Sequence, residues 1–139
     1  FDAGHLRLVP VEQSHDISRL SSIDRFVGCN TALQVGLDGA VNVERVGPRL
    51  VAGIGGHADY CAAAAQSPGG LSLIVLPSTH GERSSIVPVP TVVSTPRSDV
   101  HVVVTEHGVA DLRGLDEQER AEALIAVADP AHRPALRAR

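Results

Sequence analysis

The sequence predicts an α/β domain with an open, mostly parallel sheet and flanking helices. Apolar runs typical of strands alternate with helical patterns along the chain, an order that indicates this class. A glycine cluster between an apolar segment and an alanine-rich stretch adds a strand–turn–helix signature. The length of 139 residues suits one domain. Because aromatic residues make up only 2% of the chain, we expect a core of Val, Leu, Ile and Ala.

The first predicted element is a short helix around residues 16–20. Ser14 or Asp16 can cap its N-terminus, because a side-chain oxygen at that position accepts a hydrogen bond from a backbone N–H of the first turn. The remainder of residues 1–30 has a mixed pattern that predicts no strand.

Strand patterns begin after residue 30. Residues 33–37 and 41–46 flank Asp38-Gly39, a dipeptide that favours a type I′ turn between two antiparallel strands. Pro48 ends the second strand, since proline cannot continue a ladder of hydrogen bonds. We therefore expect a β-hairpin here.

Residues 50–65 predict a strand, a glycine turn and a helix, in that order. An apolar segment leads into Gly53-Ile54-Gly55-Gly56, and the alanine-rich stretch that follows has high helix propensity. Residues 71–76 are then an apolar run stopped by Pro77. Because this run is apolar on both faces, we expect a strand covered on both sides.

The C-terminal third predicts a strand and a helix after an irregular segment. Pro88 and Pro90 within residues 84–94 suit edge strands or an irregular ribbon. Residues 100–104 are the clearest buried strand, and Asp116 with Glu119 forms a capping box that starts a helix reaching residue 128. The residues at helical spacing that we expect to face inward are Ala121, Leu124, Ile125 and Ala128.

Composition argues against several functional classes. The formal charge of −4, the scattered arginines and the few aromatic residues disfavour a nucleic-acid-binding protein. No apolar run approaches the roughly 18 residues that a membrane span needs, and no segment resembles a signal peptide. The chain has no lysine, which excludes a Schiff-base or P-loop lysine within it.

The cysteines and the missing methionine give two further expectations. Cys29 and Cys61 are isolated in the sequence, so we expect two buried, reduced thiols in a cytoplasmic protein rather than a disulfide or a reactive thiol. The chain contains no Met and begins with Phe1. We therefore expect it to be a piece of a longer protein whose remaining part holds some of the chemistry.

The glycine cluster is the first candidate site. Gly53, Gly55 and Gly56 precede a helix, so their backbone N–H groups can approach a phosphate, or the oxyanion that forms when a carbonyl is attacked. The spacing does not fit the G-x-G-x-x-G motif of dinucleotide-binding folds. A tight turn without a ligand is the alternative.

Three other groups of residues are weaker candidates for a functional site. His57 and Cys61 are four residues apart, and His101 and His107 flank Glu106, but zinc sites need three or four convergent ligands, so we predict no metal. Glu106 follows the best strand and is a candidate nucleophile or base. We favour a structural role instead, in which Glu106 and Asp111 bond the backbone of the turn at Gly108 or pair with Arg97 or Arg113. A Ser78–His80 pair is disfavoured, since residues this close on a loop rarely reach nucleophile–base geometry.

Four segments together are similar to those of a known family. They are FVGCNTALQVGLDGAVNVE at residues 26–44, GIGGHADY at 53–60, LPST at 76–79 and DVHVVVTEHGVADLRG at 99–114. In this order they resemble stretches in the C-terminal half of the acetyl-CoA hydrolase/transferase family. The last segment is long and matches D-V-H-Y-V-V-T-E-Y-G-I-A-D-L-R-G at most positions.

The resemblance implies a function. Members of the family transfer coenzyme A between carboxylic acids, or hydrolyse acyl-CoA, on two related α/β halves. A glutamate attacks the thioester to form an acyl–enzyme anhydride, and the CoA thiolate then forms a glutamyl-CoA thioester. That glutamate lies upstream of the matching segment, so this chain alone is expected to be inactive. The implied partners are acyl-CoA, a small carboxylic acid, the N-terminal half in the same or another chain, and a second copy in a homodimer.

The resemblance also assigns site residues. Asn30 matches the asparagine near the glutamate, and Gly55 and Gly56 match the turn whose amides face the reacting carbonyl. Substrate-binding positions are carried over to Gly53, Ile54, His57 and Asp59, with Asp59 also expected to hold the turn through backbone hydrogen bonds. No permanent cofactor is implied, since CoA is a substrate.

This sequence departs from the family pattern at three positions. His57 replaces Gln, Gly36 replaces Asp, and Leu71 replaces a Lys that is a candidate contact to the CoA phosphates. The change at position 57 affects the expected substrate contacts. The competing hypothesis for residues 1–139 is a non-catalytic remnant that binds CoA or a nucleotide, or that serves as an interaction domain.

Overall fold

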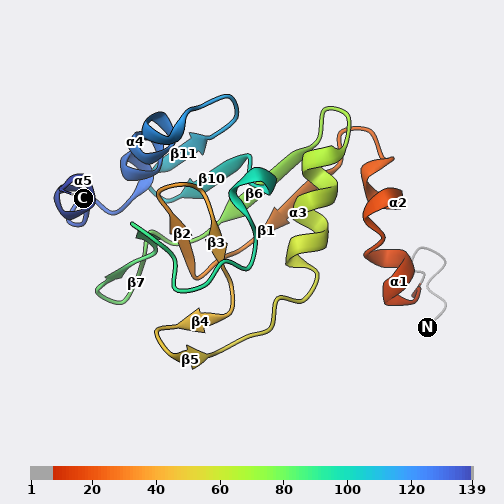
Figure 1. Ribbon diagram of the computed structural model, residues 1–139, viewed down its shortest axis with the longest axis horizontal. Helices are drawn as coiled ribbons and strands as arrows, with labels where there is room; N and C mark the ends of the chain where they lie inside the picture. The colour runs from red at the N-terminus through yellow and green to blue at the C-terminus, as the bar shows by residue number, and fades with distance from the viewer. Residues whose placement is uncertain (1–7, 139) are drawn as a thin grey trace.

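A four-stranded sheet forms the centre of the molecule, which we describe over residues 8–138 from a computed structural model (Figure 1). Its strands are β1 (Val27–Asn30), β6 (Leu71–Val75), β10 (Val102–Thr105) and β11 (Gly108–Asp111), in the spatial order β1-β6-β10-β11. The first three are parallel, and β11 returns antiparallel to β10. The predicted mostly parallel sheet and its interior strand near residues 100–104 are therefore confirmed.

Helices lie at both ends of this sheet and over one of its faces. They are α1 (Val11–Ser14), α2 (Ile17–Ser21), α3 (His57–Gln66), α4 (Glu117–Val127), α5 (Arg133–Arg137) and the 3-10 turn η1 (Arg97–Asp99). Asp16 caps α2 by accepting from Arg19 N at 3.2 Å. Both hydrogen bonds of the predicted capping box between Asp116 and Glu119 are present at the start of α4. The two helix starts were thus predicted correctly.

Short strands make three smaller sheets. Strands β2 (Gln34–Gly36), β3 (Val41–Asn42) and β9 (Ile86–Val87) form one, β4 (Arg45–Val46) pairs with β5 (Arg49–Leu50), and β7 (Thr79–His80) pairs with β8 (Arg83–Ser84). The β4–β5 ribbon projects from the body of the molecule (Figure 1). As expected, the proline-rich segment beyond β9 is irregular.

The predicted hairpin exists, but its turn type was wrong. A type I′ turn needs positive φ at both central residues, whereas only Gly39 has one (φ +95°) and Asp38 does not. The loop is instead a three-residue connection, in which Gly39 N donates to Gly36 O and Gly36 N donates to Ala40 O, both at 2.8 Å. The Asp38 carboxylate accepts from Ala40 N at 2.9 Å and holds this alternative turn.

The second strand of that hairpin is also shorter than predicted. Asn42 interrupts it, because its side-chain oxygen accepts from the backbone N–H of both Glu44 and Arg45, at 2.9 and 3.0 Å. Asparagine often redirects the chain by such local bonds. The residues predicted as one strand therefore divide between β3 and β4.

The strand that feeds the glycine turn was assigned to the wrong segment. Residues before the turn form only the exposed β5 and an irregular stretch. The sheet strand connected to α3 is β1, whose four residues, Val-Gly-Cys-Asn, show no clear strand pattern. Its inner position Gly28 lies so close to α3 that a Cβ there would fall 2.8 Å from Tyr60 O.

The sheet is covered on one face only in the described residues. Paired residues point to the same face, so Gly28, Ser72, Ile74, Val103 and Ala110 share the inner face. Helix α3 packs on this face beside Gly28, and α4 packs there through the Thr105 hydroxyl, which donates to Val127 O at 2.6 Å.

The opposite face is partly exposed, which corrects two predictions. Leu71 and Leu73 are half-buried and Val75 is 40% exposed, so the strand near residues 71–76 is not covered on both sides. Cys29 on the same face is exposed, whereas Cys61 on α3 is buried. The prediction of two buried thiols was therefore right for Cys61 and wrong for Cys29.

Candidate functional site

The predicted site residues meet where β1 ends and α3 begins. In a β–α–β unit the helix runs back across the sheet, so its N-terminus lies near the carboxyl ends of the strands, where ligands of open α/β sheets bind. Asn30 is the last residue of β1, and Gly56 is the N-cap of α3. The fold thus brings together two segments that are 26 residues apart in the sequence.

A cavity of about 400 Å³ lies at this junction. It is lined by His15, Asn30, Thr31, Val43, Ala52, Gly53, Ile54, Gly56, His57 and Tyr60. Five of the seven predicted site residues line it, the exceptions being Gly55, which is exposed beside it, and Asp59, which is half-buried in the first turn of α3. The lining is mostly neutral, so the helix N-terminus supplies the main positive potential.

The glycine turn presents its backbone to this cavity. Gly55 has φ +57°, a left-handed conformation that glycine adopts readily, and Gly56 has an ordinary φ of −85°. Within residues 8–138 no acceptor bonds the N–H of Gly55 or Gly56, whereas His57 N donates to Ile54 O at 3.3 Å. The turn therefore holds two adjacent N–H groups free to bind an anion or an oxyanion.

His57, the first residue of α3, anchors the end of the glycine turn through hydrogen bonds of its buried ring. Its side chain is only 7% exposed, with Nδ1 2.8 Å from Thr95 Oγ1 and Nε2 3.2 Å from Thr31 O. A carbonyl only accepts, so Nε2 carries the proton and Nδ1 accepts from the Thr95 hydroxyl. Burial lowers the pKa of His57, against the opposing effect of the Thr31 carbonyl. Both ring nitrogens are occupied, so the ring itself is not free to bind a ligand.

The Asn30 side chain contacts Cys61, which in turn lies near the His57 ring. Its side-chain Nδ2 lies 3.5 Å from Cys61 Sγ, and this sulfur lies 3.7 Å from His57 Nδ1. Burial raises the pKa of the Cys61 thiol, which keeps it protonated and unreactive at neutral pH. The amide oxygen of Asn30 remains available to the cavity, because no donor bonds it in the described part of the chain.

His15 is a site residue that sequence reasoning missed. A Cβ on Gly56 would overlap the His15 ring and approach Tyr60, which means that the ring lies directly over the glycine turn. His15 Nδ1 is 2.8 Å from Ser14 Oγ, its ring packs edge-on against Tyr60 at 5.0 Å, and the Tyr60 hydroxyl donates to Ser14 O at 3.1 Å. A lone histidine in a mixed segment gave no signal for this position.

Asp59 lacks one of its predicted roles. Within residues 8–138 no hydrogen bond joins its carboxylate to the backbone of the turn. Its position in the first turn of α3 favours the helix through the macrodipole instead.

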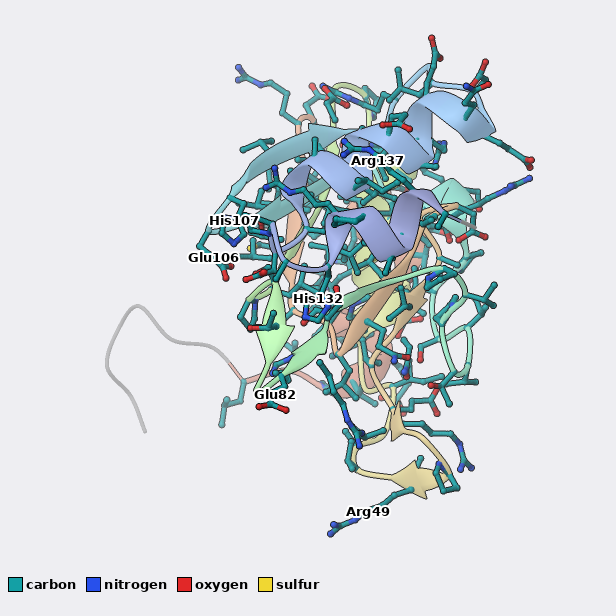
Figure 2. The ribbon with its side chains drawn as sticks, turned by 90° about the vertical axis from the view of Figure 1, so that its left-hand side faces the viewer. Arg49, Glu82, Glu106, His107, His132 and Arg137 are labelled. Atoms are coloured by element: carbon teal, nitrogen blue, oxygen red, sulfur yellow. The ribbon has the colours of Figure 1, made fainter. Side chains whose placement is uncertain are left out.

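Glu106 belongs to a separate cluster at the carboxyl ends of β6 and β10. Its Oε1 accepts from Ser78 Oγ at 2.6 Å and its Oε2 from Ser78 N at 2.9 Å, and these bonds lower its pKa to about 2. His107 lies 3.8 Å from the same carboxylate, beside it at one edge of the molecule (Figure 2). Ser78 thus bonds Glu106 rather than His80, and Glu106 bonds Ser78 rather than the turn at Gly108.

The remaining charged candidates form ion pairs. Asp111 binds Arg113 through two bonds of 2.9 and 2.6 Å, as expected, and Arg97 pairs with Glu117. In residues 8–138 no group of three His, Cys, Asp or Glu side chains is placed to hold a metal ion. None of the described helices has the length and apolar character needed to span a membrane.

Known proteins are similar to this chain in sequence and fold. The family model described as acetyl-CoA hydrolase/transferase C-terminal domain matches residues 2–139. The chain is 38% identical over 135 residues to a butyryl-CoA:acetate CoA-transferase from Anaerostipes caccae, covering 91% of this chain and 30% of that protein. It is 33% identical over 146 residues to an acetyl-CoA hydrolase from Neurospora crassa, covering 99% and 26%.

A solved structure agrees with these relatives. The crystal structure of a 4-hydroxybutyrate CoA-transferase from Porphyromonas gingivalis matches with a TM-score of 0.81 and 35% identity, covering 99% of this chain and 32% of that one. The chain thus spans about a third or less of the length of these relatives. Sequence and fold agree over nearly the whole chain, which belongs to the acetyl-CoA hydrolase/transferase family and corresponds to its C-terminal domain.

Proposed function

We propose that residues 1–139 are one C-terminal domain of an enzyme that moves CoA from an acyl-CoA to a carboxylic acid or to water. The observation that carries this proposal is the pair of unbonded N–H groups at Gly55 and Gly56, at the start of α3 and beside a cavity that also contains Asn30. Such a pair suits the negative oxygen that forms when a thioester carbonyl is attacked.

The attacking group is supplied from outside this domain. The family resemblance implies a glutamate carboxylate in the N-terminal half, which forms first an acyl–glutamyl anhydride and then a glutamyl-CoA thioester. Glu106 does not take this role, because both carboxylate oxygens are bound to Ser78 and the carboxylate lies among a different set of residues from the cavity. The open cavity beside Asn30 leaves room for an incoming carboxylate.

The other cavity residues position the substrate. Gly53 and Ile54 line the approach to the glycine turn, and the 39% exposed Ile54 side chain is suited to contact an acyl or pantetheine chain. His57 keeps the turn in place through Thr95 and Thr31 rather than by touching substrate with its ring. Asp59 lies in the first turn of α3, outside the cavity lining, and adds negative charge near the cavity. CoA enters as a substrate and no permanent cofactor is required.

A matched pair of glycine variants tests the role of the turn. Gly55 and Gly81 have φ of +57° and +61°, and a Cβ at either position meets nothing within 4 Å. Valine at either position therefore has the same backbone strain, on the order of 1–2 kcal/mol. Only Gly55→Val reorients the peptide that carries the Gly56 N–H.

The measurement is acyl-CoA turnover by the complete enzyme, meaning this domain joined to or co-expressed with its N-terminal half. Gly55→Val should lower kcat by on the order of 10²–10³, the usual effect of losing one oxyanion donor, while Gly81→Val stays near the unmodified rate. Equal rates for the two variants would show that the glycines only shape a turn.

The isolated 139-residue chain should neither transfer nor hydrolyse acyl-CoA. Turnover by the purified chain that Glu106→Gln abolishes would place the nucleophile in this domain and contradict the proposal. If the complete enzyme also lacks activity but calorimetry detects CoA binding to the chain, the competing hypothesis of a non-catalytic binding domain is the correct one.

A further inference from the structure

We propose that the exposed face of the four-stranded sheet is the surface on which helices of the N-terminal half pack. We call it the outer face; its residues are Val27, Cys29, Leu71, Leu73, Val75, Val102, Val104, Val109 and Asp111. The proposal rests on the proposed function in one respect, that this domain works as part of a longer enzyme. It does not depend on which residues perform the chemistry.

The outer face is apolar except for Asp111, which pairs with Arg113 at the β11 edge. It is uncovered over most of its extent. Val27 is 55% exposed, Val75 40% and Val109 65%, and Leu71, Leu73 and Val104 are half-buried. Within this face only Val102, at the centre, is buried, at 6%. The inner face of the same strands contains fully buried residues such as Ile74 and Val103. The contrast shows that one side of the sheet lacks a layer.

The topology indicates what kind of layer is missing. Strands β1, β6 and β10 are parallel, and parallel sheets in proteins are covered on both faces, usually by helices. Here α3, α4 and the β2–β3–β9 sheet all contribute to the single core on the inner side. The described residues therefore provide no helix for the outer face.

The length of the relatives indicates where that layer comes from. Solved and curated relatives are about three times longer than this chain, which covers 30% of one and 32% of another. An apolar face of this kind, open to water, marks an interaction site. The occupant that fits is the remaining part of the same enzyme, with helices that place Leu, Ile, Val or Phe side chains against the valines of β1, β6 and β11.

The cysteines provide an internal reporter of this contact. Cys29 is exposed on the outer face of β1, whereas Cys61, a residue of α3, is fully buried. In the isolated chain N-ethylmaleimide should modify Cys29 and leave Cys61 largely unmodified, since access controls thiol reactivity. Peptide mass spectrometry then follows each cysteine separately, even in a longer protein with additional cysteines.

The test compares Cys29 labelling in the isolated chain and in the complete enzyme. We expect labelling to slow by on the order of tenfold or more in the complete enzyme. Equal labelling would show that the face stays open and would overturn the proposal. Protection in the isolated chain that grows with protein concentration would assign the face to a second copy instead, which also overturns it.

A matched pair of valines tests the apolar contact itself. Val27 on the outer face and Val93 on the irregular segment outside the sheet are each 55% exposed, so aspartate at either position should leave the isolated chain folded. Val27→Asp should weaken association with a separately expressed N-terminal half by on the order of tenfold or more, while Val93→Asp should not. Equal association would overturn the proposal.

Because both readouts report binding rather than turnover, they remain informative if the proposed chemistry is wrong. Protected Cys29 together with normal activity of Gly55→Val would preserve the docking surface and reject the site. Unprotected Cys29 together with an inactive Gly55→Val would reject the docking surface and preserve the site.

Discussion

The buried histidine under the glycine turn makes the stability of this domain sensitive to acid. His57 is neutral in the folded chain because burial lowers its pKa, whereas in the unfolded chain its pKa is about 6.5. Below that pH the unfolded state therefore binds a proton that the folded state excludes. Stability falls as the pH decreases from about 6.5 toward the lowered pKa of the folded state.

The size of this effect has an upper limit. One proton bound only by the unfolded state gives a slope of at most about 1.4 kcal/mol per pH unit. Glutamine at position 57 has no titratable ring, yet its amide can donate to Thr31 O and accept from the Thr95 hydroxyl, as the histidine does. We therefore expect His57→Gln to change the free energy of unfolding at pH 8 by no more than about 1 kcal/mol.

Urea denaturation of the chain at several pH values between 8 and 5 is the assay. His57→Gln should lose less stability than the unmodified chain as the pH falls below about 6.5. His101 also has a pKa lowered by burial, but both proteins retain it, so only their difference reports on His57.

His57→Leu is the control for hydrogen bonding. It leaves Thr95 and Thr31 without their partner and should destabilise the chain by about 1–3 kcal/mol at every pH. Parallel stability curves for the unmodified chain and His57→Gln would refute the assignment of a buried neutral ring.

Two further predictions concern the cavity and the Glu106 cluster. Gly56→Val should lower turnover of the complete enzyme far more than it lowers stability. Gly56 has an ordinary φ, and the atoms nearest to a new Cβ belong to the His15 and Tyr60 side chains. Unchanged turnover would contradict the site. Ser78→Ala removes the hydroxyl that donates to Glu106 at 2.6 Å, so the pKa of Glu106 should rise from about 2, measured by NMR titration. Asp111 is the control, because its pKa of about 2 is lowered mainly by Arg113 and should not change. An unchanged Glu106 pKa would contradict the role of Ser78.

Helices α2, α3 and α4 and the interior strands could be predicted because their signals are local. The capping box at Asp116 and Glu119 is encoded in four consecutive residues, and the alanine-rich stretch of α3 needs no distant partner to favour a helix. The buried valines of β10 belong to one apolar run. In each case neighbouring residues carry enough information to specify the element.

The elements that prediction missed depend on contacts between distant segments. Whether the residues after Asn42 continue a strand is decided by its side chain, which both redirects the chain and donates to Gln34 Oε1 on β2 at 2.8 Å. The side-chain contact of Ser78 with Glu106 joins residues 28 positions apart. His15 lies over Gly56 only because the end of α1 contacts Tyr60 of α3. Periodicity within one segment contains none of this information.

The candidate site was predictable in its backbone and not in its side chains. A glycine cluster before a helix already indicates free N–H groups, and the structure leaves Gly55 and Gly56 unbonded by described residues. Whether His57 points to the ligand or to the core could not be decided from sequence. Thr31 and Thr95, which settle the question by binding both ring nitrogens, come from separate loops.

Strand β1 shows why the site and the docking surface are difficult to recognise and are closely linked. Alternation along Val27-Gly28-Cys29-Asn30 places Gly28 and Asn30 toward α3 and Val27 and Cys29 on the outer face. The inner positions therefore allow close helix approach and face the candidate site rather than bury apolar surface, which removes the usual strand pattern. A Cβ on Gly28 would lie 2.8 Å from Tyr60 O and 3.3 Å from Ala64 Cβ, so any side chain there would push α3 away and separate the glycine turn from Asn30. Four residues thus fix the distance across the cavity on one side of the sheet and form part of the proposed docking surface on the other.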